Sequence, residues 1–212
     1  LIPVGFPLAA VVEGGEVVYA EGFGVRELGQ AKEVTPDTLM MIGSVSKSMT
    51  TLMMATLVDD GKLSWTAPVR SVYPRFTLGD AELAARLQVQ HLVCACAGLP
   101  RKDLPLMLEF GDKKPGDVFG ELSTLEPSTG LGETFQYQNH MVAAGGYVAG
   151  HALHGEAPVG EAYDRAMAER VFAPLGMKRT TLRQAAALAD ADHATPHSMD
   201  LQGKHHVVPI SH

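Results

Sequence analysis

The sequence feature that most constrains the fold is a nearly uncharged stretch from Ser44 to Val58, in which Lys47 is the one charged residue. Apolar side chains cover nearly every side of a helix drawn through it; they are Met49, Leu52, Met53, Met54, Ala55, Leu57 and Val58. A helix that is apolar all round is typical of a buried segment. We therefore expect a central helix that begins near Ser44 and ends at Gly61, because glycine is a natural C-terminal cap.

A charged residue is unexpected in such an apolar helix, and an interaction with Ser44 would explain why Lys47 is there. Ser44 and Lys47 are three residues apart, which places them on one face of a helix within reach of each other. Burial disfavours the charged form of a lysine, and the neutral amine can act as a base. The first turn of a helix also favours an anion, so the backbone N–H of Ser44 is a candidate oxyanion donor. The alternative is that Ser44 caps the helix and Lys47 extends to water.

A second polar pair precedes another apolar helix. Tyr137 and Asn139 are two apart, so their side chains face the same way if the segment is extended. A tyrosine near a lysine can exchange a proton with a serine nucleophile, and an asparagine amide can orient the lysine and the substrate. Alternatively, Tyr137 is an aromatic residue of the rim and Asn139 is the N-cap of the helix that follows.

The order of the predicted elements indicates an α+β fold. Residues 9–20 predict a β-hairpin around Gly14 and Gly15, and residues 39–43 predict a strand that leads directly into the central helix. Later segments predict helices, and a weak strand signal follows at 205–210. The helical segments are residues 85–98, 140–153 and 160–176.

A long segment rich in Gly and Pro, residues 109–135, predicts a loop that forms the rim of a binding site. Phe119, Leu122 and Leu125 would give this rim an apolar character. Such a rim favours acyl esters or hydrophobic amides as substrates.

The composition excludes several classes of protein. The chain has 212 residues, a net charge of −7 and no cluster of Lys and Arg, which argues against nucleic-acid binding. Its apolar runs are shorter than the roughly 18 to 20 residues of a membrane span, so we expect none. Cys94 and Cys96 are too close for an ordinary structural disulfide and lack a second pair for zinc. We expect them to be small buried core residues.

The histidines near the end of the chain are the remaining candidates for a metal site; they are His193, His197, His205, His206 and His212. Pro196 makes a regular helix between the first two unfavourable, and no carboxylate stands at a recognised ligand spacing. We therefore expect no metal. The residues given carry no signal peptide, and they indicate neither a periplasmic or secreted compartment nor a cytoplasmic one, nor an oligomeric state.

Taken together, these motifs resemble the serine β-lactamase and penicillin-binding-protein-like family, nearest the branch of class C β-lactamases, D-aminopeptidases and family VIII esterases. The resemblance covers most of the chain, in the family's order and approximate spacing. The matching segments are residues 11–26, 34–69, 89–100, 132–150 and 171–182. Ser-x-x-Lys followed by Tyr-x-Asn in these settings is a fairly specific combination.

The resemblance implies a β-lactamase/transpeptidase-like fold, with an antiparallel sheet flanked by helices, a helical lobe, and the active site in the cleft between them. It places an α/β lobe with the nucleophile helix at about residues 1–60, a mainly helical lobe at about 61–175, and a return towards the sheet at 176–212. Residues 1–212 would form one incomplete domain, because family members begin earlier and continue with further strands.

By the same resemblance, Ser44 is the acylated nucleophile and Lys47 its activating base. Tyr137 relays protons and helps to activate the deacylating water, and Asn139 is a hydrogen-bond donor on the substrate side. The expected activity is hydrolysis of a β-lactam, a small ester or a D-amino-acid peptide through a covalent acyl-enzyme, with no cofactor. The partner is then a small-molecule substrate.

The sequence departs from the family pattern in two motifs, and the first departure supports an alternative function. No Lys-Thr-Gly, Lys-Ser-Gly or His-x-Gly motif follows Tyr137, although the family carries one on a strand at the sheet edge that supplies the second oxyanion N–H. Residues 94–98 read Cys-Ala-Cys-Ala-Gly where the family often has a Ser-His-Thr-Ser-Gly run. The alternative function is a catalytically silent member or fragment that acts as a binding module.

Overall fold

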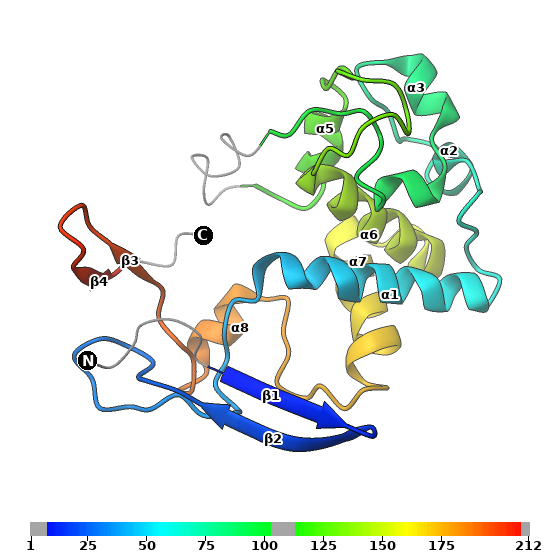
Figure 1. The fold of residues 1–212 in the computed structure, drawn as a ribbon. Helices are drawn as coiled ribbons and strands as arrows, with labels where there is room; N and C mark the ends of the chain where they lie inside the picture. The colour runs from blue at the N-terminus through cyan, green and yellow to red at the C-terminus, as the bar shows by residue number, and fades with distance from the viewer. Residues whose placement is uncertain (1–7, 103–112, 209–212) are drawn as a thin grey trace. The chain divides into compact units, whose positions relative to one another are not determined.

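The computed structural model describes residues 8–102 and 113–208, and Figure 1 draws its elements. The chain divides into two compact units, one made of Leu1–Met41 with Arg179–His212 and the other of Ile42–Lys178. The first unit contains β1 (Leu8–Glu13), β2 (Glu16–Gly22), α8 (Gln184–Ala189), β3 (His197–Met199) and β4 (His205–Val207).

The second unit is helical (Figure 1). Its elements are η1 (Gly43–Val45), α1 (Ser46–Asp59), α2 (Val69–Val72), α3 (Ala81–Arg86), η2 (Val89–Leu92), α5 (Asp117–Leu122), α6 (Asn139–His154), α7 (Val159–Met167) and the π-helical η3 (Ala168–Phe172). Helix α1 packs against α6, α7 and η3 within this unit.

The first unit begins with the predicted hairpin. Strands β1 and β2 pair antiparallel, and Gly14 and Gly15 form the turn with φ angles of 58° and 88°, which glycine adopts without steric cost. Strands β3 and β4 form a second antiparallel pair, which confirms the weak strand signal near residue 205.

The strand predicted at residues 39–43 is not formed. Leu39 makes an isolated parallel bridge with His193, and the chain then turns at Gly43, whose φ of 51° begins the 3₁₀ turn η1. The apolar residues after Leu39 therefore have no paired neighbour in a ladder. Met41 is 79% exposed, so this run does not form a buried strand.

Helix α1 is formed as predicted, but it is buried on one face only. Its buried residues, Thr50, Met53, Met54 and Leu57, recur at helical spacing, whereas Leu52 is 45% exposed. The prediction of a helix packed all round was wrong, because the helices that cover α1 lie against this single face.

The end of α1 agrees with the sequence. Gly61 has a φ of 68°, its N–H donates to the carbonyl of Val58, and the Lys62 N–H donates to the carbonyl of Leu57. These two bonds form a Schellman motif, which satisfies carbonyls at the helix end.

The helix predicted at residues 85–98 is broken. Helix α3 ends at Arg86, and the next residues are extended because the Val69 N–H donates to the Leu87 carbonyl and the Val89 N–H donates to the Ala67 carbonyl. A backbone paired in this way cannot also continue a helical ladder. The predictions at 140–153 and 160–176 are confirmed by α6 and by α7 with η3.

Part of the predicted rim is core. Residues 109–112 lie outside the described residues, but Leu122 and Leu125 are 0% and 6% exposed and belong to a hydrophobic cluster of the helical unit. Phe119 stacks on Tyr73 with ring centroids 4.7 Å apart. Phe119 and Leu122 lie on the short helix α5 and Leu125 follows it, and all three pack in or against this cluster, so they do not line a substrate rim.

Among the described residues, no helix combines the length and the apolar character needed to cross a membrane.

Candidate active site

The site is built first on the junction between η1 and α1. Ser44 lies in the 3₁₀ turn and Lys47 is the second residue of α1, so a single helical turn connects them. The ammonium nitrogen of Lys47 donates a hydrogen bond to Ser44 Oγ at 3.0 Å, as their spacing predicts. Ser44 is exposed and Lys47 is half-buried, so the expectation of a buried lysine was wrong.

Tyr137 joins this pair from a distant part of the chain. Its hydroxyl donates to Ser44 Oγ at 2.7 Å, although the two residues are 93 apart in the sequence. Two backbone bonds hold the segment before it: the Gln136 N–H donates to the Ala95 carbonyl at 2.7 Å, and the Gly132 N–H donates to the Cys96 carbonyl at 2.8 Å. The position of Tyr137 therefore depends on the loop that carries the two cysteines.

Ser44 differs from the other hydroxyl residues of its helix. Ser46, Ser48, Thr50 and Thr51 each donate to a backbone carbonyl three or four residues earlier. Ser and Thr side chains in helices commonly form such hydrogen bonds to a nearby backbone carbonyl. The oxygen of Ser44 instead accepts bonds from two ionisable side chains, which can take or return its proton.

Positive charge surrounds the Tyr137 phenol. Lys47 Nζ lies 4.9 Å from the centre of the ring, and the guanidinium carbon of Arg101 lies 5.2 Å from it. A hydrogen bond with Lys47 is the main cause that lowers the pKa of Tyr137 below its ordinary 10.0. The hydrogen bond with Ser44 and the charges of Lys47 and Arg101 add to this effect, while burial opposes it.

Asn139 lies at the start of α6 and does not cap it. The N-cap is Gln138, whose side chain accepts a bond from the His140 N–H at 2.9 Å. Asn139 instead lines a cavity of about 290 Å³ together with Lys47, Tyr147 and other residues of the helical unit. Below we call it the Asn139 cavity.

A second hollow lies beside Lys47 and Tyr137. This cavity of about 270 Å³, the Tyr137 cavity, is mostly apolar on its walls. Its lining includes Lys47, Val93, Cys94, Phe135, Tyr137 and Val142. Lys47 thus borders both cavities, and an exposed Phe135 replaces the predicted rim residues as the apolar group at the site.

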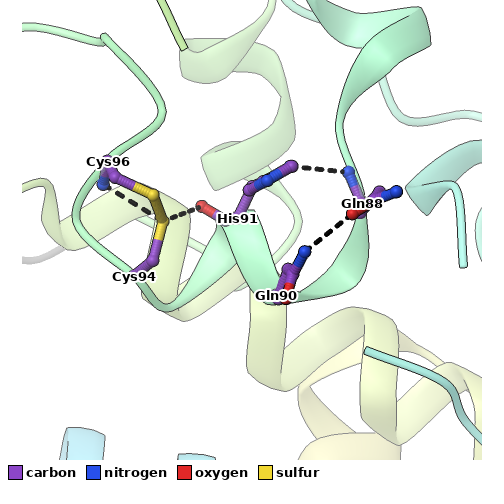
Figure 2. Close-up of a disulfide and its surroundings, with 5 residues drawn as sticks. All are labelled: Gln88, Gln90, His91, Cys94 and Cys96. Atoms are coloured by element: carbon purple, nitrogen blue, oxygen red, sulfur yellow. Dashed lines mark hydrogen bonds between the residues drawn. A yellow bond between two sulfur atoms is a disulfide. The ribbon is translucent and has the colours of Figure 1, made fainter. Parts of the chain in front are cut away.

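The two cysteines contradict the prediction of buried core residues. Cys94 and Cys96 form a disulfide, Cys94 is exposed and Cys96 is half-buried. Figure 2 shows the pair just after η2, with the Cys96 N–H directed at the sulfur of Cys94, 3.2 Å away. Their Cα atoms are 5.2 Å apart, within the range that disulfides span, because the intervening Ala95 has a φ of 54°. The sequence spacing alone did not indicate this turn.

Other residues of the site also escaped the sequence analysis. Arg101, over the Tyr137 ring, lies in an irregular segment without a periodic pattern. His140 is buried and its Nε2 contacts a carboxylate oxygen of Glu121 on α5, which anchors the start of α6. The one available signal for His140 was a polar residue at the start of an apolar helix.

Metal ligands do not cluster in the part of the chain that the structure describes. No group of three or more His, Cys, Asp or Glu residues is arranged there to hold a metal ion. His197 Nε2 accepts a bond from the Leu28 N–H, and His193 Nδ1 lies 2.6 Å from the carbonyl oxygen of Asp190. His212 lies outside the described residues.

Known proteins resemble the chain over most of its length. A family model described as Beta-lactamase matches residues 8–209. The chain is 27% identical over 181 residues to an unguisins hydrolase of Aspergillus campestris (strain IBT 28561), covering 82% of the chain and 32% of that protein. It is 27% identical over 179 residues to penicillin-binding protein 4 of Amycolatopsis lactamdurans, covering 83% of the chain and 44% of that protein.

Among solved structures, the octameric penicillin-binding protein homologue from Pyrococcus abyssi is similar with a TM-score of 0.75 and 25% identity. The alignment covers 94% of this chain and 45% of that one. The predicted α+β, β-lactamase/transpeptidase-like fold is thereby confirmed. The chain spans less than half of the length of these three proteins.

Proposed function

Because the chain belongs to the beta-lactamase family, we propose that it is a serine hydrolase in which Ser44 carries the acyl group. The observation that supports this most directly is the double contact on Ser44 Oγ, which accepts hydrogen bonds from Lys47 and Tyr137 at 3.0 and 2.7 Å. A nucleophilic serine requires a neighbouring group that can remove its proton, and Tyr137 and Lys47 are both within hydrogen-bond distance to do so in their deprotonated forms.

In the proposed reaction, Ser44 Oγ attacks the carbonyl carbon of the substrate, and its proton passes to Tyr137 as the phenolate or to Lys47 as the free amine. The lowered pKa of Tyr137 favours the phenolate, with the charge of Lys47 beside it. The leaving group then takes this proton as its bond to the carbonyl carbon breaks. An ester between the acyl group and Ser44 results.

Hydrolysis of the acyl-enzyme by water uses the same proton transfers in reverse order. A water molecule gives a proton to Tyr137 and attacks the acyl-enzyme, and Ser44 leaves with a proton returned by the same group. We propose the backbone N–H of Ser44 as an oxyanion donor and the Asn139 amide, in the cavity shared with Lys47, as a donor to the substrate.

The substrate class that we propose is a small ester or amide with an apolar acyl group, β-lactams included. The support is the Tyr137 cavity, whose walls include Val93, Phe135 and Val142. Apolar walls with a few convergent polar groups are typical of sites for small molecules. A volume of about 270 Å³ is at the small end for such sites.

The test is intact-mass spectrometry after brief exposure to a fluorophosphonate, a penicillin and a p-nitrophenyl ester in separate reactions. We expect one adduct per chain, absent in Ser44→Ala. Ser71→Ala is the matched control, because it removes an exposed serine hydroxyl of α2 that bonds the Pro68 carbonyl and lines neither cavity. It should label like the parent protein.

The outcome also decides between hydrolase and binding module. If a chain that circular dichroism shows to be folded takes no adduct from any of the three reagents, the hydrolase proposal fails and the binding module replaces it. If Ser44→Ala is labelled as fast as the parent, the nucleophile is another residue.

A further inference from the structure

The disulfide between Cys94 and Cys96 lies on the wall of the candidate active site. Cys94 lines the Tyr137 cavity together with Lys47 and Tyr137, all within the helical unit. These are the two cysteines of the whole chain. Figure 2 shows the bond at the end of η2, with the Cys94 sulfur near both the Cys96 N–H and the carbonyl oxygen of His91.

The bond is poorly suited to stabilising the fold. A disulfide gains stability mainly by closing a loop in the unfolded chain, and the gain grows with loop length. Cys94 and Cys96 enclose one residue, Ala95, so the gain is small. Neither cysteine belongs to the two hydrophobic clusters of the helical unit. An exposed sulfur with little structural role is accessible to small thiols.

The same loop holds the segment that carries Tyr137. The Ala95 carbonyl accepts the Gln136 N–H, and the Cys96 carbonyl accepts the Gly132 N–H. Ala95 has a φ of 54°, a left-handed conformation that is unfavourable for a residue with a side chain. The disulfide ring holds Ala95 there. Opening the ring allows Ala95 to adopt an ordinary negative φ, which turns the carbonyl bonded to Gln136, the neighbour of Tyr137.

We propose that Cys94 and Cys96 form a thiol–disulfide exchange site for small thiols and disulfides, whose redox state sets the position of Tyr137 and so the reactivity of Ser44. The effect on Ser44 rests on the function proposed above. The exchange itself and its effect on Tyr137 do not.

The chemistry balances with a small thiol as reductant. Its thiolate attacks the exposed Cys94 sulfur, the S–S bond breaks, and Cys96 leaves as a thiolate that takes a proton. A second thiol attacks the reagent sulfur of the mixed disulfide and releases Cys94, so two thiols become one disulfide and the protein gains two electrons and two protons. In the reverse direction Cys94 attacks a small disulfide, and the Cys96 N–H is placed to stabilise its thiolate.

The experiment compares the folded protein treated with dithiothreitol, or with dithiothreitol followed by glutathione disulfide. N-ethylmaleimide and intact mass count the thiols, and we expect two adducts after reduction and none after reoxidation. The rate of fluorophosphonate labelling at Ser44 should change at least threefold between the two states. The double variant Cys94→Ser with Cys96→Ser should label at the reduced rate in both.

A readout at Tyr137 separates this proposal from the proposed function. Ultraviolet absorbance follows phenol ionisation, and subtraction of the Tyr137→Phe curve isolates Tyr137. We expect its pKa to move towards the ordinary value on reduction. A shift without any labelling at Ser44 would leave this inference standing and reject the hydrolase.

Three results would overturn the inference: no maleimide uptake by the folded protein in dithiothreitol, Ser44 labelling that is measurable but equally fast in the two states, or an unchanged Tyr137 titration. Loss of folding on reduction, seen by circular dichroism, would assign the disulfide a structural role and overturn it as well.

Discussion

Replacement of Tyr137 by phenylalanine tests the proton transfer at the candidate site most directly. The change removes the hydroxyl that lies 2.7 Å from Ser44 Oγ and leaves the ring beneath Lys47 and Arg101. The ring contacts and the backbone bonds that hold the segment remain, so the variant should fold like the parent. The loss is then confined to proton transfer.

The expected magnitude follows from the role assigned to this hydroxyl. A positioned general acid–base group contributes about 10² to 10⁴ in rate, which corresponds to about 3 to 5 kcal/mol of activation free energy. The Lys47 contact on Ser44 is retained in the variant and can take part of the proton transfer. We therefore expect a loss near the lower end, about a hundredfold in the rate of fluorophosphonate labelling.

The pH dependence gives a second, independent signature. The pKa of Tyr137 lies below 10.0, mainly because of its hydrogen bond with Lys47, so the phenolate fraction rises as the pH increases through that lowered value. If the phenolate is the base, the labelling rate of the parent rises with pH, and the midpoint of this rise lies below pH 10.0. In Tyr137→Phe this rise should be missing.

Tyr19→Phe is the matched control, because it removes a phenol hydroxyl from the exposed strand β2 in the other compact unit. It should label within twofold of the parent. The reasoning is refuted if Tyr137→Phe, with unchanged thermal unfolding, labels within threefold of the parent and keeps the same pH profile. Lys47 alone would then be sufficient as the base.

Two further predictions concern the helical unit that carries the site. Gly150→Ala should lower the free energy of unfolding by about 1 to 2 kcal/mol in urea titration, because its Cβ would lie 2.7 Å from the backbone nitrogen of Tyr163. Gly120→Ala is its control, since nothing lies within 4 Å of the added Cβ and stability should rise by up to about 1 kcal/mol; equal effects would reject the argument. For Glu121, burial raises the pKa but the hydrogen bond from Lys113 and the pair with His140 outweigh it and lower the pKa below 4.5. Its stabilising effect is therefore present above pH 4.5 and is lost as the pH falls through the lowered value. Unfolding free energies across this range should converge for Glu121→Gln and the parent at acid pH, and a constant gap would contradict this.

The sequence predictions that agree with the structure are those based on residues close together in the chain. Two glycines fixed the hairpin turn, Gly61 fixed the end of α1, and the i, i+3 spacing brought Lys47 to Ser44. Each of these depends on residues only a few positions apart, so the backbone geometry of one turn is enough to determine it.

The errors arose where distant segments compete with local preference. The helix predicted over residues 85–98 is interrupted because part of this segment forms backbone hydrogen bonds with residues 67–69. Leu122 and Leu125 were expected at the rim of a binding site, but they are buried in the core. Neither the pairing partner nor the covered face is encoded in local periodicity, because both are set by which segment packs against which.

The sequence by itself determined the helix, the hairpin and the pairing of Ser44 with Lys47, since those contacts lie within single turns of the chain. Only the tertiary structure decided that Tyr137 meets Ser44 across 93 residues, with Arg101 over its ring. Side chains so far apart come together only when the packed elements and the backbone bonds of the cysteine loop hold their segments in place.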